Sequence, residues 1–187
     1  SLSPSAPLET CAKAAMQRLE LVHDWLARQF PGRPLSVAPA SADASFRRYF
    51  RVTFDDGLTR IVMDAPPEHE DCRPFVHVAG LLHEAGVHAP EILAQDLERG
   101  LLLLTDLGSI TYLDALDASN ADGLFRDALD AILKWQLASR PDALPPYDEA
   151  LLRRELNLFP DWYVARHLGS PLTAPQQEVL EQVQALL

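Results

Sequence analysis

Phosphate binding is the first chemistry that the residue types of this chain suggest. Small residues occupy positions 41–45, and two arginines follow closely at Arg47 and Arg48. Small side chains let backbone N–H groups approach a ligand, and arginine pairs well with phosphate oxygens. The pattern therefore predicts a phosphate-binding loop. A second interpretation, a solvated edge hairpin whose arginines face water, fits the same residues about equally well.

Two other groups of reactive residues have simpler explanations. His69 lies among the acids of positions 68–71, which could ligate a metal. Acidic residues just before a helix also complement its dipole, and we favour that interpretation. Cys11 and Cys72 each stand alone, without the spacing of a metal site or a disulfide framework. Lone cysteines of this kind are typical of a reducing, cytoplasmic compartment.

The two arginines lie at the start of an expected β-hairpin. Residues 46–54 are rich in aromatic and β-branched side chains, and residues 59–63 form a second short apolar run. Between them stands Asp55-Asp56-Gly57, a turn signal because Asp and Gly tolerate positive φ. The hairpin would hold the small-residue segment at one end of a sheet.

The hairpin belongs to an expected α+β chain with two lobes. The first, residues 1–108, should contain in order a helix over 8–30, a linker or leading strand over 34–39, the hairpin, a helix over 74–85 ended by Gly86, and strands within 87–94 and over 101–104. The last run is wholly apolar, which favours a central strand. The second lobe, residues 109–187, should be helical over 112–116, 120–138, 148–159 and 173–187.

Charge and hydropathy narrow the class of partner. The formal net charge is −11, which argues against a protein held mainly by nucleic-acid phosphates. No apolar run approaches the roughly 20 residues of a membrane-spanning helix. We therefore expect neither a nucleic-acid partner nor a membrane.

Three stretches resemble the aminoglycoside phosphotransferase-like family of small-molecule kinases, which has a bilobal protein-kinase-like fold. SFRRYFRV is similar to the family's phosphate-covering hairpin, LLHEAGVHAPEIL to its passage from helix to strand, and LLLLTDLG to the linker strand that hydrogen-bonds adenine. The order and spacing match over residues 41–108. IVMDAPPE and RRELNLFPDWYV further resemble bacterial anomeric kinases, which phosphorylate N-acetylmuramate and N-acetylglucosamine at C1 in cell-wall recycling.

This resemblance implies ATP and Mg²⁺ as cofactors, a small sugar as substrate and a monomeric parent protein. The residues that it places at the nucleotide, through side chain or backbone, are Ser45, Arg47, Arg48, Phe50, Val62, Thr105 and Leu107. The residues that it suggests for the sugar are Asp106 and Glu155, and Asp106 could instead meet a partner in the other lobe. Glu155 lies on a polar helix, so a solvated surface charge is the alternative interpretation there.

Asp64 departs from the family pattern, because the kinase lysine of this strand would fall at its position. An aspartate repels phosphates unless a cation intervenes. Either Arg47 or Arg48 supplies the positive charge, or the pocket binds its nucleotide in an unusual way. The alternative interpretation of Asp64 is a strand-end acid that pairs with an arginine.

The family's catalytic loop is a second departure, because no H-x-D-x-x-x-x-N motif occurs. The chain thus resembles an N-terminal portion, with catalytic residues expected beyond Leu187, and we expect no turnover from it alone. Its last apolar stripe, within 173–187, predicts self-association. The alternatives are a kinase of choline, homoserine or an aminoglycoside, and a non-catalytic module that binds a nucleotide or a partner.

Overall fold

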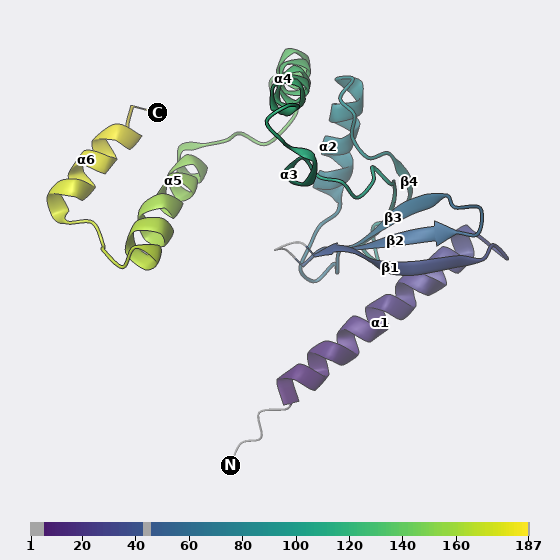
Figure 1. Cartoon of the computed structure of the whole chain (residues 1–187). Coiled ribbons are helices and arrows are strands. Elements are labelled where there is room, and N and C mark those ends of the chain that lie inside the picture. Colours follow the sequence, from purple (N-terminus) through teal and green to yellow (C-terminus); the bar gives the residue numbers. More distant parts are fainter. Residues whose placement is uncertain (1–5, 43–45, 187) are drawn as a thin grey trace. The chain divides into compact units, whose positions relative to one another are not determined.

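The computed structural model describes residues 6–42 and 46–186, and its chain divides into two compact units between Ser139 and Arg140. The first unit contains helix α1 (Ala6–Gln29), five strands, α2 (Arg73–Glu84), α3 (Tyr112–Ala115) and α4 (Ala121–Ala138) (Figure 1). The second contains α5 (Glu149–Leu158), the π-helical segment η1 (Phe159–His167) and α6 (Ala174–Gln184). The expected division into lobes at residue 108 stays a prediction.

A five-stranded antiparallel sheet forms the centre of the first unit. Its strands are β1 (Leu35–Ala42), β2 (Arg48–Phe54), β3 (Thr59–Asp64), β4 (Ile92–Asp96) and β5 (Leu101–Thr105). Their order across the sheet is β1-β2-β3-β5-β4. The fold class is confirmed, since an antiparallel sheet is followed by helices. The four leucines of β5 are all buried between β3 and β4, as the wholly apolar run predicts.

The hairpin of β2 and β3 forms as expected. Phe50 pairs with Val62, and the turn between the strands includes Gly57 at φ 82°. The strand before it is longer than residues 34–39, because β1 continues through Ser41, which pairs with Tyr49. The small-residue segment therefore begins inside a strand. Register shifts at Pro39/Ser41 in β1 and at Ile92/Ala94 in β4 interrupt the two outer strands.

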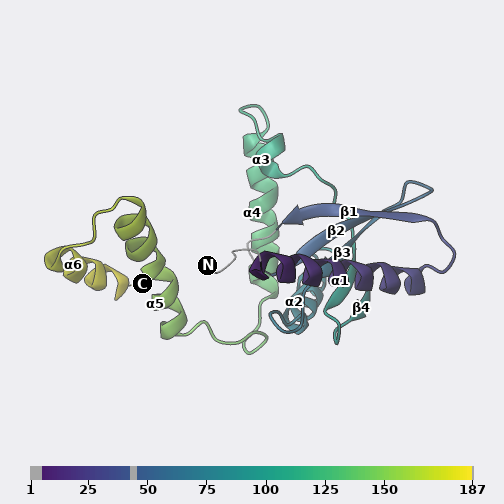
Figure 2. The same ribbon diagram turned by 90° about the horizontal axis from the view of Figure 1, so that it is seen from below.

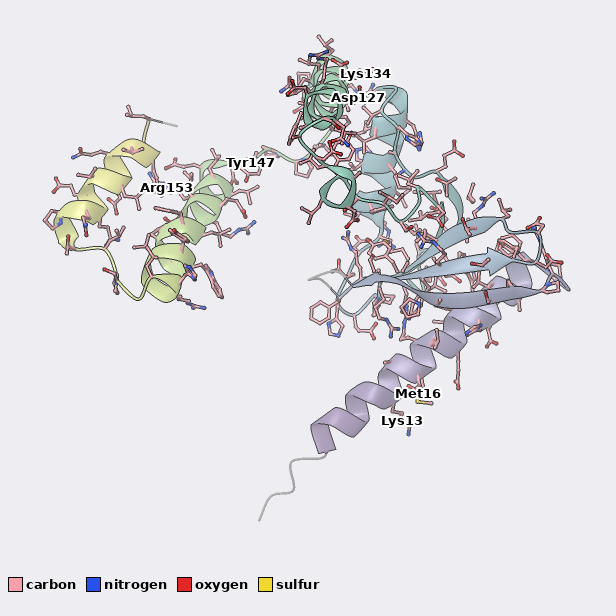
Figure 3. All side chains as sticks on the ribbon, in the orientation of Figure 1. Lys13, Met16, Asp127, Lys134, Tyr147 and Arg153 are labelled. Atoms are coloured by element: carbon pink, nitrogen blue, oxygen red, sulfur yellow. The ribbon has the colours of Figure 1, made fainter. Side chains whose placement is uncertain are left out.

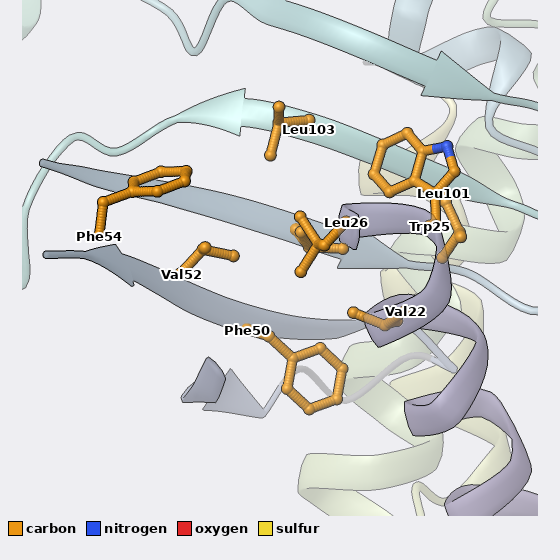
Figure 4. Close-up of a cluster of buried hydrophobic side chains, with 9 residues drawn as sticks. Val22, Trp25, Leu26, Phe50, Val52, Phe54, Leu101 and Leu103 are labelled. Carbon is orange, nitrogen blue, oxygen red and sulfur yellow. The ribbon is translucent and has the colours of Figure 1, made fainter. Parts of the chain in front are cut away.

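The C-terminal half of α1 covers one face of the sheet (Figures 1 and 2). Val22, Trp25 and Leu26 pack there against apolar side chains of β2, β3 and β5, and none is more than 3% exposed (Figure 4). Residues at intervals of three and four lie on one face of a helix, which explains the choice of these three. This apolar layer is the main core of the unit.

Helix α2 packs on a second apolar cluster, which includes Met63, Leu102 and Leu104. Gly86 ends this helix with φ 71°, as expected for the residue after the helix end. The turn into a strand that was expected within 87–94 is present, with β4 beginning at Ile92. Pro90 lies before the strand, where it needs no N–H for a strand ladder.

The helices after the sheet have well-formed N-termini. Thr111 caps α3 and Thr173 caps α6, each in a capping box with the residue three positions on. None of the residues from α3 to α6 that the structure describes is buried. Asp127 and Lys134 on α4 and Arg153 on α5 are exposed (Figure 3). Within residues 6–42 and 46–186, no helix combines the length and apolarity needed to cross a bilayer.

Candidate functional site

A cavity of about 420 Å³ lies in the first unit, at the ends of strands β2, β3 and β5. The strands contribute Tyr49, Arg51, Ile61 and Leu104, and the segment that leaves β5 contributes one wall. The complete lining is Ala40, Ser41, Tyr49, Arg51, Ile61, Phe75, Pro90 and every residue from Leu104 to Thr111. Most of this lining is apolar, with an ion pair at one side, which is typical of a small-molecule site.

Alternation along the strands decides which side chains reach the cavity. Tyr49 and Ile61 line it, whereas their neighbours Phe50 and Val62 point to the opposite face and lie in the core under α1. Phe50 is 7% exposed and Val62 is fully buried. The structure thus does not bring Phe50 and Val62 to this cavity. A shift of one residue along a strand exchanges the two faces of the sheet. Tyr49 and Ile61 therefore line the cavity in place of their neighbours Phe50 and Val62, which were expected there.

An arginine of β2 holds the segment that leaves β5. Arg51 Nε donates to Asp106 Oδ2 at 2.6 Å, and Arg51 Nη2 donates to Asp106 Oδ1 at 3.1 Å and to the carbonyl oxygen of Gly108 at 3.0 Å. The hydrogen bond from Arg51 holds the pKa of Asp106 well below its usual value, at about 2, against the opposing effect of burial. Asp106 is therefore an anion at neutral pH, with its charge already matched.

Thr105 and Leu107 both line the cavity, but only the polar groups of Thr105 already have hydrogen-bond partners within the described residues. Thr105 N–H donates to the carbonyl of Glu91 at 3.0 Å, and its hydroxyl accepts from Glu91 N–H at 2.9 Å. Leu107 is 53% exposed, and in the part of the chain that the structure describes its N–H and C=O have no hydrogen-bond partner. The expected contact of Leu107 with a ligand stays a prediction that this geometry permits.

Arg48 contacts a buried acid. Its Nε and Nη2 donate to Asp64 Oδ2 at 3.1 and 2.5 Å, and Arg18 of α1 donates to the other carboxylate oxygen. Asp64 is fully buried. The expected pairing of this strand-end aspartate with an arginine is therefore present, and the phosphate role of Arg48 is a separate question.

Arg47 pairs with Glu70, at 3.2 Å between its Nε and the carboxylate, and beside it the rings of Phe46 and His69 stack at 4.4 Å. Ser45 lies outside the described residues. In residues 6–42 and 46–186 no group of three or more His, Cys, Asp or Glu side chains could hold a metal ion. The role of the paired arginines at phosphate stays a prediction.

Glu155 lies on α5 in the second compact unit, with its carboxylate 3.6 Å from Nε of Arg154. Its neighbours Arg153 and Asn157 line a separate groove of about 290 Å³ between α5 and α6. The suggested contact of Glu155 with a sugar stays a prediction.

Comparison with known families decides what kind of protein presents this cavity. Residues 36–187 match the model of the phosphotransferase enzyme family. The chain belongs to this family. The match includes every strand of the sheet except the first residue of β1, and it covers the helices from α2 to α6 but not α1.

Three relatives of this phosphotransferase chain carry the name N-acetylmuramate/N-acetylglucosamine kinase. The protein of Pseudomonas aeruginosa is 64% identical over 139 residues, which are 74% of this chain and 41% of the relative. That of Pseudomonas putida is 57% identical over 152 residues, 81% of this chain and 44% of the relative. That of Neisseria meningitidis is 39% identical over 171 residues, 89% of this chain and 51% of the relative. The chain spans about half the length of the curated relatives that it matches.

The sequence analysis missed Arg51, the charged residue of the cavity that pairs with Asp106, as well as apolar lining residues such as Tyr49 and Ile61. The contact of Arg51 with Asp106 joins residues 55 positions apart, and nothing in a single sequence marks such a pair. Two features were readable: Arg51 shares a strand face with Tyr49, and Asp106 follows directly after the apolar run of β5. Together they could have placed both charges at the same end of the sheet.

Proposed function

We propose that the protein carrying this chain is an ATP-dependent kinase that phosphorylates N-acetylmuramate and N-acetylglucosamine at the C1 hydroxyl. The names of the three relatives support this substrate class. This chain would supply the nucleotide-covering lobe, residues 1–108, and the beginning of the helical lobe, residues 109–187. We further propose that the protein is a cytoplasmic monomer, consistent with its lone cysteines.

The cavity beside the last strand is the observation that carries the proposal. It combines apolar side chains from Ile61 and Leu104 with the backbone of Leu107, whose two polar groups have no partner among the described residues. A purine ring is flat and apolar on its faces and carries hydrogen-bonding groups on its edge. Its faces would lie between the apolar side chains, and its edge would meet Leu107. The volume of about 420 Å³ is within the range of small-molecule sites.

The residues of this chain would act by binding and orientation. ATP, when bound, supplies the phosphoryl group, and transfer depends mainly on the positioning of the phosphates and on their electrostatic stabilisation. Ile61 and Leu104 would exclude water from the base. Arg47 and Arg48 remain our proposed phosphate contacts, since arginine pairs well with phosphate oxygens and the two lie directly before and at the start of β2.

The acids near the sheet do not fit a magnesium site. The carboxylates of Asp64, Asp106 and Glu70 each face at least one arginine rather than one another. Mg²⁺ requires nearly octahedral oxygen donors, and in the described residues these acids do not provide a shared set. We therefore derive no step from a metal held by this part of the protein.

The complete protein encoded by the gene should be tested with radiolabelled ATP against N-acetylmuramate, N-acetylglucosamine, choline, homoserine and kanamycin. We expect phosphorylated product with the two amino sugars, labelled at C1. A matched variant, Ile61→Trp, would fill the cavity from the strand face and should raise the KM for ATP about tenfold or more, the equivalent of at least ~1.4 kcal/mol. The KM for the sugar should stay the same.

Turnover of choline, homoserine or kanamycin without turnover of the amino sugars would contradict the substrate class and leave the kinase assignment in place. Failure of every acceptor, together with failure to bind ATP, would contradict the kinase assignment. An Ile61→Trp variant with unchanged KM for ATP would place the nucleotide elsewhere.

A further inference from the structure

The turn formed by residues 106–108 is fixed by side chains rather than by the sheet. It follows Thr105, the last residue of β5, and it is not part of a strand. One wall of the cavity is this turn and the residues after it. What holds the turn therefore decides the shape of that wall.

Arg51, Asp106 and Gly108 form a closed ring of hydrogen bonds. Arg51 donates to both carboxylate oxygens of Asp106 and to the carbonyl of Gly108, and Gly108 N–H donates back to Asp106 Oδ1 at 2.9 Å. The side chain of Asp106 is only 6% exposed, so water competes weakly with this ring. Bidentate pairs of this kind impose geometry as well as attraction.

The ring of hydrogen bonds involves residues 106 and 108, and Leu107 between them takes no part in it. Gly108 has φ 98°, a conformation that other residues rarely adopt, and this bends the chain at the end of the turn. Leu107 is left with its N–H and C=O unpaired among the described residues, beside the cavity. The turn is thus built to fix one conformation around a backbone donor and acceptor that nothing within this part of the chain uses.

We propose that Arg51 and Asp106 are positioning residues that set which purine base the cavity accepts, by fixing the donor and acceptor of Leu107. This rests on the proposed function as an ATP-dependent kinase. The edge of a 6-aminopurine offers a ring-nitrogen acceptor beside an amino donor. A 6-oxopurine offers the reverse, a ring N–H donor beside a carbonyl acceptor. A rigid N–H and C=O pair matches one pattern only, whereas a mobile turn can adapt to either.

Asp106 was suggested for the sugar, and its contacts point to this different role. Both of its carboxylate oxygens are already occupied by Arg51, and one also accepts from Gly108 N–H. A sugar hydroxyl would have to displace these charge-assisted bonds. Asp106 therefore acts on a ligand through Leu107, and the ring should influence the nucleotide and leave the sugar unaffected.

The test uses the complete protein and N-methylanthraniloyl-ADP as a fluorescent probe, displaced by ATP or GTP. Arg51→Met keeps the aliphatic stem and removes the guanidinium, and Asp106→Asn keeps an acceptor for Gly108 N–H and removes the charge. Arg60→Met is the matched control: this arginine lies on the neighbouring strand β3 and donates to the carbonyl of Thr59. The KM for ATP, the KM for the sugar and the melting temperature are measured for each.

We expect Arg51→Met to lower the preference for ATP over GTP about tenfold and to raise the KM for ATP by a similar factor, the usual effect of losing a well-placed hydrogen bond. The KM for the sugar should change less than about twofold. Arg51→Lys should give a partial loss, because lysine pairs as a point charge without the planar fork. Arg60→Met should leave the ATP-to-GTP ratio at the wild-type value.

Each other outcome has a defined consequence. If the wild-type protein does not bind the probe, the proposed function fails. If the wild type binds and Arg51→Met keeps both ATP affinity and the ATP-to-GTP ratio, only the positioning role is overturned. A variant that weakens ATP and GTP equally would also overturn it, because loss of fold would act on both bases. If Arg51→Met does not fold, the ATP-to-GTP ratio of the milder Asp106→Asn variant tests the positioning role instead.

Discussion

The sheet and the helices that follow it differ in where their apolar side chains lie. The strands β2, β3 and β5 bury theirs on both faces, under α1 and against α2. On α4, by contrast, Phe125, Leu129 and Leu133 are each more than half exposed, and the described part of α4–α6 contains no buried side chain. Antiparallel strands close a core among near neighbours in sequence, whereas a helix with one apolar face needs another surface to cover it.

Substitution of Asp64 should produce the largest difference in stability between the sheet and the helices that follow it. Asp64→Ala removes a fully buried carboxylate and leaves Arg18 and Arg48 without their shared partner, which should cost about 3–5 kcal/mol of unfolding free energy. Urea denaturation with peptide-resolved hydrogen exchange would locate the loss. Exchange should accelerate in the strands and stay unchanged in α4–α6.

The matched control for this prediction is Asp55→Ala. Asp55 is 60% exposed and lies 4.0 Å from Arg33, so its removal should cost less than about 1 kcal/mol. Equal losses of unfolding free energy for the Asp64 and Asp55 variants would show that the buried ion pairs do not hold the sheet and α1 together.

A pair of leucines tests the comparison directly. Leu26→Ala, in the core under α1, should cost about 2–5 kcal/mol, because it removes buried contacts and leaves a cavity. Leu133→Ala on α4, where the side chain is 54% exposed, should stay within about 0.5 kcal/mol. Chemical denaturation of both variants measures the difference. A large loss for Leu133→Ala would mean that α4 buries its apolar face in solution.

Lowering the pH should destabilise the sheet region more than the later helices, and this difference in unfolding free energy should be smaller than those above. The pKa of Asp106 is lowered to about 2 from an ordinary value near 3.8, so the folded state binds this proton less readily than the unfolded state. The stabilisation is complete above about pH 4 and is lost as the pH falls to about 2. A tenfold change in proton affinity corresponds to about 1.4 kcal/mol, so this stabilisation amounts to at most about 2.5 kcal/mol.

The measurement is the unfolding free energy at pH 7, 4 and 2.5 for the wild type and Asp106→Asn. The difference in unfolding free energy between the wild type and Asp106→Asn should become smaller as the pH falls. Hydrogen exchange in the second unit, which begins at Arg140 and does not contain Asp106, should not distinguish wild type from variant. A constant gap would contradict the ion pair with Arg51.

Much of this arrangement was readable from the sequence, because local signals fix local structure. The Asp55-Asp56-Gly57 turn predicts the hairpin, Gly86 predicts the end of α2, and the wholly apolar run at 101–104 predicts a buried strand. The order of these elements, with the motifs around them, was also sufficient to indicate the phosphotransferase family.

The faces of the strands were harder to predict. On β2 and β3 both faces carry apolar side chains, Tyr49 and Ile61 on one and Phe50 and Val62 on the other, so hydropathy alone does not show which face meets the cavity. That choice depends on α1, which covers one face from a distant part of the chain. The contacts of Arg18 with Asp64 and of Arg51 with Asp106 are equally non-local.

The irregular outer strands of the sheet determine how copies of this chain can meet. An open sheet edge exposes backbone donors and acceptors, and such an edge templates the addition of further strands. Here β1 has a proline without an N–H beside its register shift at Pro39/Ser41, and β4 has a similar shift at Ile92/Ala94. Neither edge offers a regular ladder, so growth into fibrils by strand addition is blocked on both sides. Crowded or concentrated chains should therefore adhere through the exposed leucines and phenylalanine of α4, in a form that stays helical and reverses on dilution.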